Sequence, residues 1–133
     1  YAVGMEGSLK LKEISYIHSE AYAAGELKHG PISLIEDGTV VFSVVTQSAL
    51  YEKTISNMVE VKSHGAKLFG LTTYGNYAME DVADFTVYTP RVDNLFAASL
   101  SVVPLQLLSY YVSVGKGYDV DKPRNLAKSV TVE

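Results

Sequence analysis

Residues 39–72 read TVVFSVVTQSALYEKTISNMVEVKSHGAKLFGLT and predict a strand, a helix and a second strand in succession. The β-branched run at 39–45 shows little alternation between apolar and polar residues, which predicts a strand covered on both faces. The second strand is predicted at 67–72. Two strands joined by a helix pair in parallel through a right-handed crossover, so this stretch indicates an α/β fold.

The helix between these strands is predicted from Ala49 to about Ser63. Thr46-Gln47-Ser48 supplies polar residues suited to cap its first turn. Gly65 is a suitable residue to end it, because glycine adopts the left-handed conformation common after a helix. We expect the inner face of the helix to carry the residues Leu50, Thr54, Met58 and Val61.

The same reading extends to both sides of this unit. Residues 6–17 predict a first helix, and residues 19–28 predict further helix that breaks around Gly25 and ends at Gly30-Pro31. Residues 84–88 predict a third strand, and residues 93–114 a long helix. The expected fold is α/β, a small parallel sheet flanked by helices on both faces in a flavodoxin-like three-layer arrangement. We also expect at least one N-terminal strand to be missing, because three strands make a small sheet.

Composition narrows the functional classes. The chain has 133 residues, 47% of them hydrophobic and 20% charged, which suits one domain with a core. Its net charge of −4 and the lack of a basic stripe argue against a nucleic acid partner. There is no cysteine, so a thiolate metal site, a disulfide and a cysteine nucleophile are excluded. The three histidines have no ligand spacing, and no metal or cofactor is expected.

One stretch is long enough to be compared with a membrane span. The residues between Asp93 and Lys116 carry no charge. Several serines and Pro104 interrupt this stretch, and amphipathic helices and strands surround it. We interpret it as a core helix that can also serve as a subunit interface, and we expect no membrane partner.

Candidate functional residues gather in Met5–Pro31, MEGSLKLKEISYIHSEAYAAGELKHGP. Glu6, Lys10 and Glu13 stand four and three residues apart, so on a helix they lie within roughly 60° of one another. Leu9 and Ile17 place an apolar stripe beside Glu13. A carboxylate base, the imidazole of His29 and the amine of Lys128 would suffice for chemistry at a carbonyl carbon.

Each of these residues also has a simpler interpretation. Glu13 could be a solvated carboxylate paired with Lys10, a contact that contributes only about 0.3–0.5 kcal/mol. His29, in a Gly-Pro turn, could be a surface residue. Lys128 could be a solvated charge near the chain end, where an amine is a weak nucleophile. From the residues alone these alternatives stay open.

Two long segments carry a resemblance to a known family. EGSLKLKEISYIHSEAYAAGELKHGP at 6–31 and VPLQLLSYYVSVGKGYDVDKPRNLAKSVTVE at 103–133, with the strand–helix order between them, resemble the glucosamine-6-phosphate synthases, or glutamine–fructose-6-phosphate aminotransferases. The likeness is to their second sugar-isomerase (SIS) domain and covers the whole chain. It implies residues 1–118 as that domain, truncated at its N-terminus, and residues 119–133 as a tail closing over the sugar site.

The resemblance implies an activity. Members carry a glutaminase domain and two SIS domains, and convert fructose 6-phosphate and glutamine-derived ammonia to glucosamine 6-phosphate. They are cytoplasmic and dimeric. The glutaminase and the first SIS domain, which holds the phosphate, are absent from this chain, and Thr46-Gln47-Ser48 is too sparse to form a phosphate cradle. The fragment alone is therefore expected to be inactive or weakly active. The alternative is a non-catalytic SIS module that binds a phosphosugar.

The resemblance also implies roles for individual residues. Glu13 corresponds to the base that moves a proton between C1 and C2 of the sugar. Lys128 corresponds to the amine that forms a Schiff base, and His29 to a ring-opening histidine contributed by the neighbouring subunit. The residues with supporting or substrate-binding roles are Glu6, Lys10 and Ala127, and those along the ammonia path are Arg124, Asn125 and Leu126.

Overall fold

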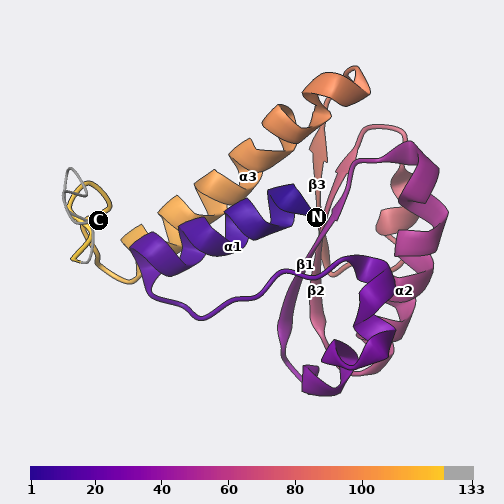
Figure 1. Ribbon diagram of the computed structural model, residues 1–133, viewed down its shortest axis with the longest axis horizontal. Coiled ribbons are helices and arrows are strands. Elements are labelled where there is room, and N and C mark those ends of the chain that lie inside the picture. Colours follow the sequence, from indigo (N-terminus) through magenta and orange to yellow (C-terminus); the bar gives the residue numbers. More distant parts are fainter. Residues whose placement is uncertain (125–133) are drawn as a thin grey trace, which may run out of the picture.

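The computed structural model describes residues 1–124 and forms three layers. Its middle layer is a parallel sheet in the order β1-β2-β3, formed by Val40–Val45, Lys67–Thr73 and Phe85–Thr89. Helix α2 (Tyr51–Ser63) covers one face (Figure 1). Helices α1 (Ala2–Ser15) and α3 (Asn94–Gly115) lie side by side on the other. The α/β prediction, with helices on both faces, is confirmed.

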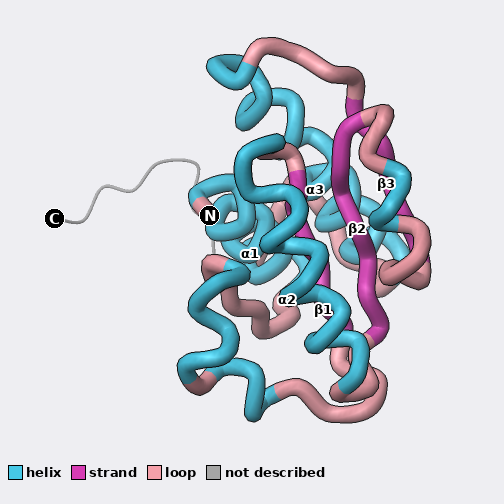
Figure 2. Tube along the Cα trace, turned by 90° about the vertical axis from the view of Figure 1, so that its right-hand side faces the viewer, coloured by secondary structure: helices cyan, strands magenta, loops and turns pink. Residues whose placement is uncertain are grey.

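Short 3₁₀ helices connect these elements. They are η1 (Ala24–His29), η2 (Pro31–Leu34), η3 (Ser48–Leu50) and η4 (Tyr77–Met79). Figure 2 shows the strands side by side. Helix α2 lies in the connection from β1 to β2, and the short helix η4 lies in the connection from β2 to β3. The predicted strands and the long helix agree with the structure to within one or two residues.

The core lies between the sheet and α2. Met58 and Val61 of α2 are buried against Ala66 and Leu68, and Leu27 of η1 packs against this cluster. Leu50 was predicted on the inner face of this helix but is exposed. It precedes α2, in the 3₁₀ turn η3, where the 3.6-residue period does not yet hold.

The predicted cap of α2 is also wrong. The first turn of α2 has no hydrogen bond from a capping side chain, because η3 intervenes between Thr46-Gln47-Ser48 and Tyr51. The hydroxyl of Thr46 instead accepts a hydrogen bond of 3.2 Å from Ser101 in α3. Thr46 therefore joins the end of β1 to the opposite layer.

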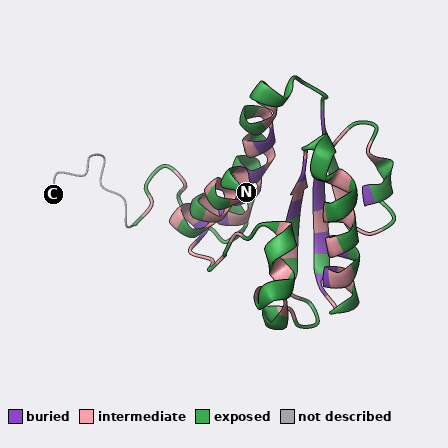
Figure 3. Cartoon of the chain, turned by 45° about the vertical axis from the view of Figure 1, so that its right-hand side comes forward, coloured by how far each residue is buried: buried purple, intermediate pink, exposed green. Residues whose placement is uncertain are grey.

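The sheet face turned toward α1 and α3 is covered only in part. Phe42, Phe69 and Phe85 stack across the three strands, with ring centroids 4.8 and 5.1 Å apart. Phe42 is 40% exposed and Phe85 63% exposed, so the prediction that 39–45 is covered on both faces is wrong. On the same face Leu71 and Thr89 are buried, nearer the carboxyl ends of the strands. The α1–α3 layer thus shields the carboxyl half of this face and leaves the amino half open (Figure 3).

Helices α1 and α3 pack closely because small residues meet at their interface. A Cβ atom on Gly7 would lie 2.7 Å from Cδ1 of Leu105. Along α3 a buried row recurs every four residues and comprises Ser101, Leu105, Ser109 and Ser113. The opposite face of α3 is exposed, which differs from the expected core helix. By length and composition α3 could also cross a membrane.

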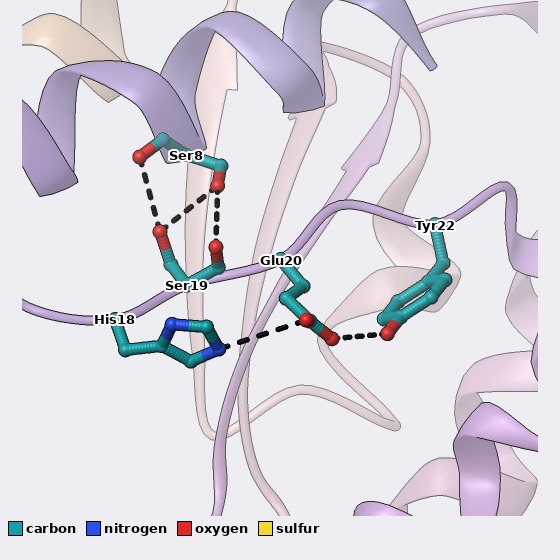
Figure 4. Close-up of polar contacts among 5 residues, drawn as sticks. All are labelled: Ser8, His18, Ser19, Glu20 and Tyr22. Atoms are coloured by element: carbon teal, nitrogen blue, oxygen red, sulfur yellow. Dashed lines mark hydrogen bonds and ion pairs between the residues drawn. The ribbon is translucent and has the colours of Figure 1, made fainter.

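The segment after α1 is extended rather than helical, which corrects the prediction for 19–28. Helix α1 ends at Ser15 because Tyr16 adopts a left-handed conformation with φ 58°. Ser8 and Ser19 then hold the extended chain: the Ser8 hydroxyl donates to the Ser19 carbonyl oxygen at 2.9 Å, and the Ser19 hydroxyl donates to the Ser8 carbonyl oxygen at 3.0 Å (Figure 4). Helical backbone resumes only at Ala24, as the 3₁₀ helix η1.

Candidate functional site

The polar row predicted on the first helix is present on α1. Lys10 Nζ lies 2.7 Å from Glu13 Oε2 and 3.6 Å from Glu6 Oε1. The hydrogen bond to Glu13 is the largest cause of a raised pKa for Lys10, whose partial burial acts in the opposite direction. The Glu13 side chain is 25% exposed. Glu13 is therefore a half-buried carboxylate held by one cation, with part of its surface free to meet a substrate.

His29 lies in a different part of the fold. It is the last residue of η1 and is exposed, followed by Gly30 with φ 147°. The element η1 packs against α2, whereas α1 packs along α3 (Figure 1). Within residues 1–124 no hydrogen bond or ion pair connects His29 with Glu13. These two predicted site residues are not brought together by the described part of one chain.

The predicted tail residues Asn125, Leu126, Ala127 and Lys128 lie outside the described residues. Arg124 is described and lies beside the end of α1. Its backbone N–H donates 2.9 Å to the Tyr16 hydroxyl, and its guanidinium carbon is 3.9 Å from the centre of the Tyr16 ring. The described chain therefore reaches the carboxyl end of the helix that carries Glu13.

A polar cavity that the sequence reasoning did not identify lies at the carboxyl ends of the strands. Its volume is about 190 Å³. Arg91 is the charged residue in its lining, and its guanidinium lies against Gly75, where a Cβ would be 2.9 Å from Nη2. The hydroxyl and amide residues of the lining are Thr46, Ser48, Thr73, Asn76, Thr89, Asn94 and Ser101. Such a lining suits a small anion, because a guanidinium and hydroxyl groups bind carboxylates and phosphates.

The sequence does contain a signal for this cavity. Thr46 directly follows β1, and Thr73 and Thr89 are the last residues of β2 and β3. Because the carboxyl ends of parallel strands meet at one edge, three threonines at these ends are brought together. Within residues 1–124 no group of three His, Asp or Glu side chains could hold a metal ion.

Comparisons with known proteins agree with this fold. Residues 1–115 match the model of the SIS domain. The chain is 63% identical over its whole length to the glutamine–fructose-6-phosphate aminotransferase of Clostridium tetani, but it spans only 22% of that protein.

Two solved structures are similar over nearly the whole chain. The C-terminal domain of the glucosamine–fructose-6-phosphate aminotransferase from Francisella tularensis is 43% identical over 92% of this chain and 35% of that one, with a TM-score of 0.84. A glucosamine-6-phosphate deaminase from Thermotoga maritima is 32% identical over 98% of this chain and 37% of that one, with a TM-score of 0.77. From its sequence and its three-layer structure alike, the chain belongs to the SIS domain family.

Proposed function

We propose that this chain is the C-terminal part of the isomerase half of a glucosamine-6-phosphate synthase. Residues 1–118 would be its second SIS domain and residues 119–133 a tail over the sugar site. The observation that carries the proposal is the Lys10–Glu13 pair on α1, in a chain 63% identical throughout to an aminotransferase of this kind. The rest of the enzyme, including the glutaminase and first SIS domain, would lie outside these residues.

The proposed chemistry assigns one step to each group. The amine of Lys128 attacks the C2 carbonyl of open-chain fructose 6-phosphate, releasing water and forming an imine. Ammonia then displaces the lysine amine at C2. Glu13 accepts a proton from C1 and returns one to C2, while the O1 hydroxyl loses its proton and the imine nitrogen gains one, so the ketose imine becomes the amino aldose. Lys10 supports this role, because its 2.7 Å contact orients the Glu13 carboxylate. No cofactor is needed, since the imine itself acidifies the C1 proton.

The exposed position of His29 supports a second subunit in this proposal. An imidazole at the surface of η1, away from α1, is accessible to a sugar bound by another copy, where it could act in ring opening. We further propose that the enzyme is a homodimer, soluble and cytoplasmic, with no nucleic acid or membrane partner.

Helix α3 offers a surface for such an assembly. Its exposed face carries apolar residues seven, four, three and four positions apart, the spacing used by packed helices: Phe96, Val103, Leu107, Tyr110 and Val114. Replacing Leu107 with Lys should lower the apparent mass in light scattering if α3 joins two copies. A matched change at exposed Val59 of α2 should not.

A second candidate function has its own support. The cavity lined by Arg91 and the strand-end threonines could bind a phosphosugar without turnover. In that case Arg91→Gln would abolish binding, whereas changes at Glu13 and Lys128 would leave it intact.

A borohydride trap distinguishes the two functions. Full-length enzyme is incubated with fructose 6-phosphate, reduced, digested and mapped by mass spectrometry. The synthase proposal predicts a reduced sugar adduct on Lys128, none in Lys128→Arg, and an adduct without product in Glu13→Gln. Sugar binding with no adduct in the wild type would favour the binding module instead. The 133-residue chain alone should turn over sugar poorly, so efficient isomerisation by it would count against the proposal.

A further inference from the structure

Tyr16 has a backbone conformation that needs an explanation. It is the only residue other than glycine with a positive φ in residues 1–124, at φ 58° and ψ 27°. The left-handed conformation costs free energy for a side chain with a Cβ atom, and glycine or asparagine usually occupies it at a helix end. Tyrosine in this place indicates that its side chain makes contacts that offset the cost.

Those contacts go to the segment that follows α3. The Tyr16 hydroxyl accepts a hydrogen bond of 2.9 Å from the backbone N–H of Arg124. The Arg124 guanidinium lies over the Tyr16 ring, 3.9 Å from its centre. Tyr118 meets the same ring edge-on at 5.0 Å. One side chain therefore holds both the backbone and the side chain of Arg124.

Two hydrogen bonds join the helix ends next to this contact. Lys116 Nζ donates 2.7 Å to the carbonyl oxygen of Ser15, the residue before Tyr16. Ser113 donates 2.6 Å to the carbonyl oxygen of Ile14. The carboxyl ends of α1 and α3 are thus joined directly beside Tyr16.

We propose that Tyr16 is a positioning residue that holds Arg124, the residue before the C-terminal segment 125–133, at the carboxyl end of α1. The ring and the hydroxyl contribute separately, one through the guanidinium and the other through the backbone N–H. Residue 16 lies three positions after Glu13 on the same stretch of chain. The held residue therefore contacts the chain just after the helix that carries Glu13.

The consequence for the reaction rests on the proposed function. Lys128 follows Arg124 by four residues, and four residues span at most about 14 Å when fully extended. If Arg124 is held, that length limits how far the backbone of residue 128 can lie from the end of α1. If Arg124 is released, this limit no longer applies.

Trypsin cleavage after Arg124 tests the contact in the 133-residue chain without any activity assay. Tyr16→Asn removes the ring and the hydroxyl while keeping a residue that tolerates the left-handed backbone. We expect it to raise the cleavage rate after Arg124 about tenfold, because cleavage follows the population of the released state. Tyr16→Phe keeps the ring and should raise the rate only about threefold.

Two controls make this result specific. Tyr111→Asn changes an exposed tyrosine of α3 and should leave cleavage after Arg124 unchanged. Cleavage after Lys53, in α2, reports general loosening of the fold. A rate after Arg124 within twofold of wild type in Tyr16→Asn would overturn the proposal. Equal acceleration after Arg124 and Lys53 would overturn it as well.

A second readout separates this inference from the proposed function. In the full-length enzyme, Tyr16→Asn should lower the borohydride-trapped adduct on Lys128 and Tyr16→Phe should largely restore it. A wild type that forms no adduct would contradict the proposed function, while the trypsin result would still decide whether Tyr16 holds Arg124. A wild-type adduct that Tyr16→Asn leaves unchanged would overturn the positioning role.

Discussion

The hydroxyl of Ser113 donates a 2.6 Å hydrogen bond to the carbonyl oxygen of Ile14, although 99 positions separate the two residues. Ile14 lies in the last turn of α1, where carbonyl oxygens have no partner within their own helix. Lys116 does the same for Ser15. The end of α3 therefore satisfies the end of α1, which explains how these two helices form one layer.

Replacing Ser113 with Ala should lower the free energy of unfolding by about 1–2 kcal/mol, because the Ile14 carbonyl loses its donor. Ser109 is a matched control. It is equally buried, but its hydroxyl donates to the Leu105 carbonyl of its own helix, so Ser109→Ala should change stability by less than about 0.5 kcal/mol. Urea denaturation measures both. Similar losses in the two variants would contradict a special role for Ser113.

Glycine-to-alanine changes on α1 should differ in sign according to the space around them. A Cβ on Gly7 would lie 2.7 Å from Leu105 Cδ1, so Gly7→Ala should destabilise the chain by about 1–3 kcal/mol. A Cβ on Gly4 would meet Ala21 at an ordinary 3.8 Å, so Gly4→Ala should stabilise it by up to about 1 kcal/mol. Thermal midpoints should therefore move in opposite directions. A gain in midpoint for Gly7→Ala would show that the helices do not meet at this position.

The Lys10–Glu13 contact predicts a stability change at high pH. The hydrogen bond to Glu13 raises the pKa of Lys10 above its ordinary value in the folded chain. The stabilisation is therefore present at lower pH and is lost as pH rises through the folded value. Because both side chains are partly exposed, the loss should be only about 0.3–0.5 kcal/mol. Glu13→Gln should remove this part of the pH dependence, measured by denaturation on both sides of the Lys10 titration. An identical pH profile in the variant would count against the contact.

Tyr88 should lose its proton at a higher pH than an ordinary tyrosine. Desolvation, followed by the 2.6 Å hydrogen bond from its hydroxyl to Glu80 and the Glu80 charge, raises the pKa of Tyr88 to about 12. Since the folded value exceeds the unfolded one, the folded state loses stability as pH rises through this range. The phenolate absorbance of wild type minus that of Tyr88→Phe isolates the titration. Glu80→Gln should lower its midpoint, and a wild-type midpoint near 10 would contradict the prediction.

Local sequence patterns predicted the strands of the sheet well. They failed where contacts between distant residues determine the backbone conformation. The β-branched run before Thr46 and the glycine at 65 mark strand and helix ends through backbone preferences that act locally. The extended chain after Tyr16 is different. Residues 19–28 contain good helix formers, yet the bonds between Ser8 and Ser19 hold the chain extended after α1, and helical backbone resumes only at Ala24. The contacts of Tyr16 with Arg124 lie where α1 ends. Contacts between residues that are 11 and 108 positions apart leave no periodic pattern in the sequence.

The residues of the candidate site also differ in whether local spacing or the overall fold brings them together. Lys10 and Glu13 face each other because their spacing on one helix requires it, so the sequence was sufficient. Arg91 and the threonines of the polar cavity come from three strand ends, and only the parallel topology brings them together. His29 shows the remaining difficulty, since the fold around η1 places it at the surface and away from α1.

The stacked rings of Phe42, Phe69 and Phe85 have a practical consequence. They form an apolar column on the open half of the sheet, and within residues 1–124 its outer strands, β1 and β3, each have one edge that pairs with no other strand. Contacts between such surfaces weaken on cooling and strengthen in sulfate or phosphate salts. Purified chain should therefore stay clear of precipitate longest when kept cold in dilute buffer, and cloud first when warmed in ammonium sulfate.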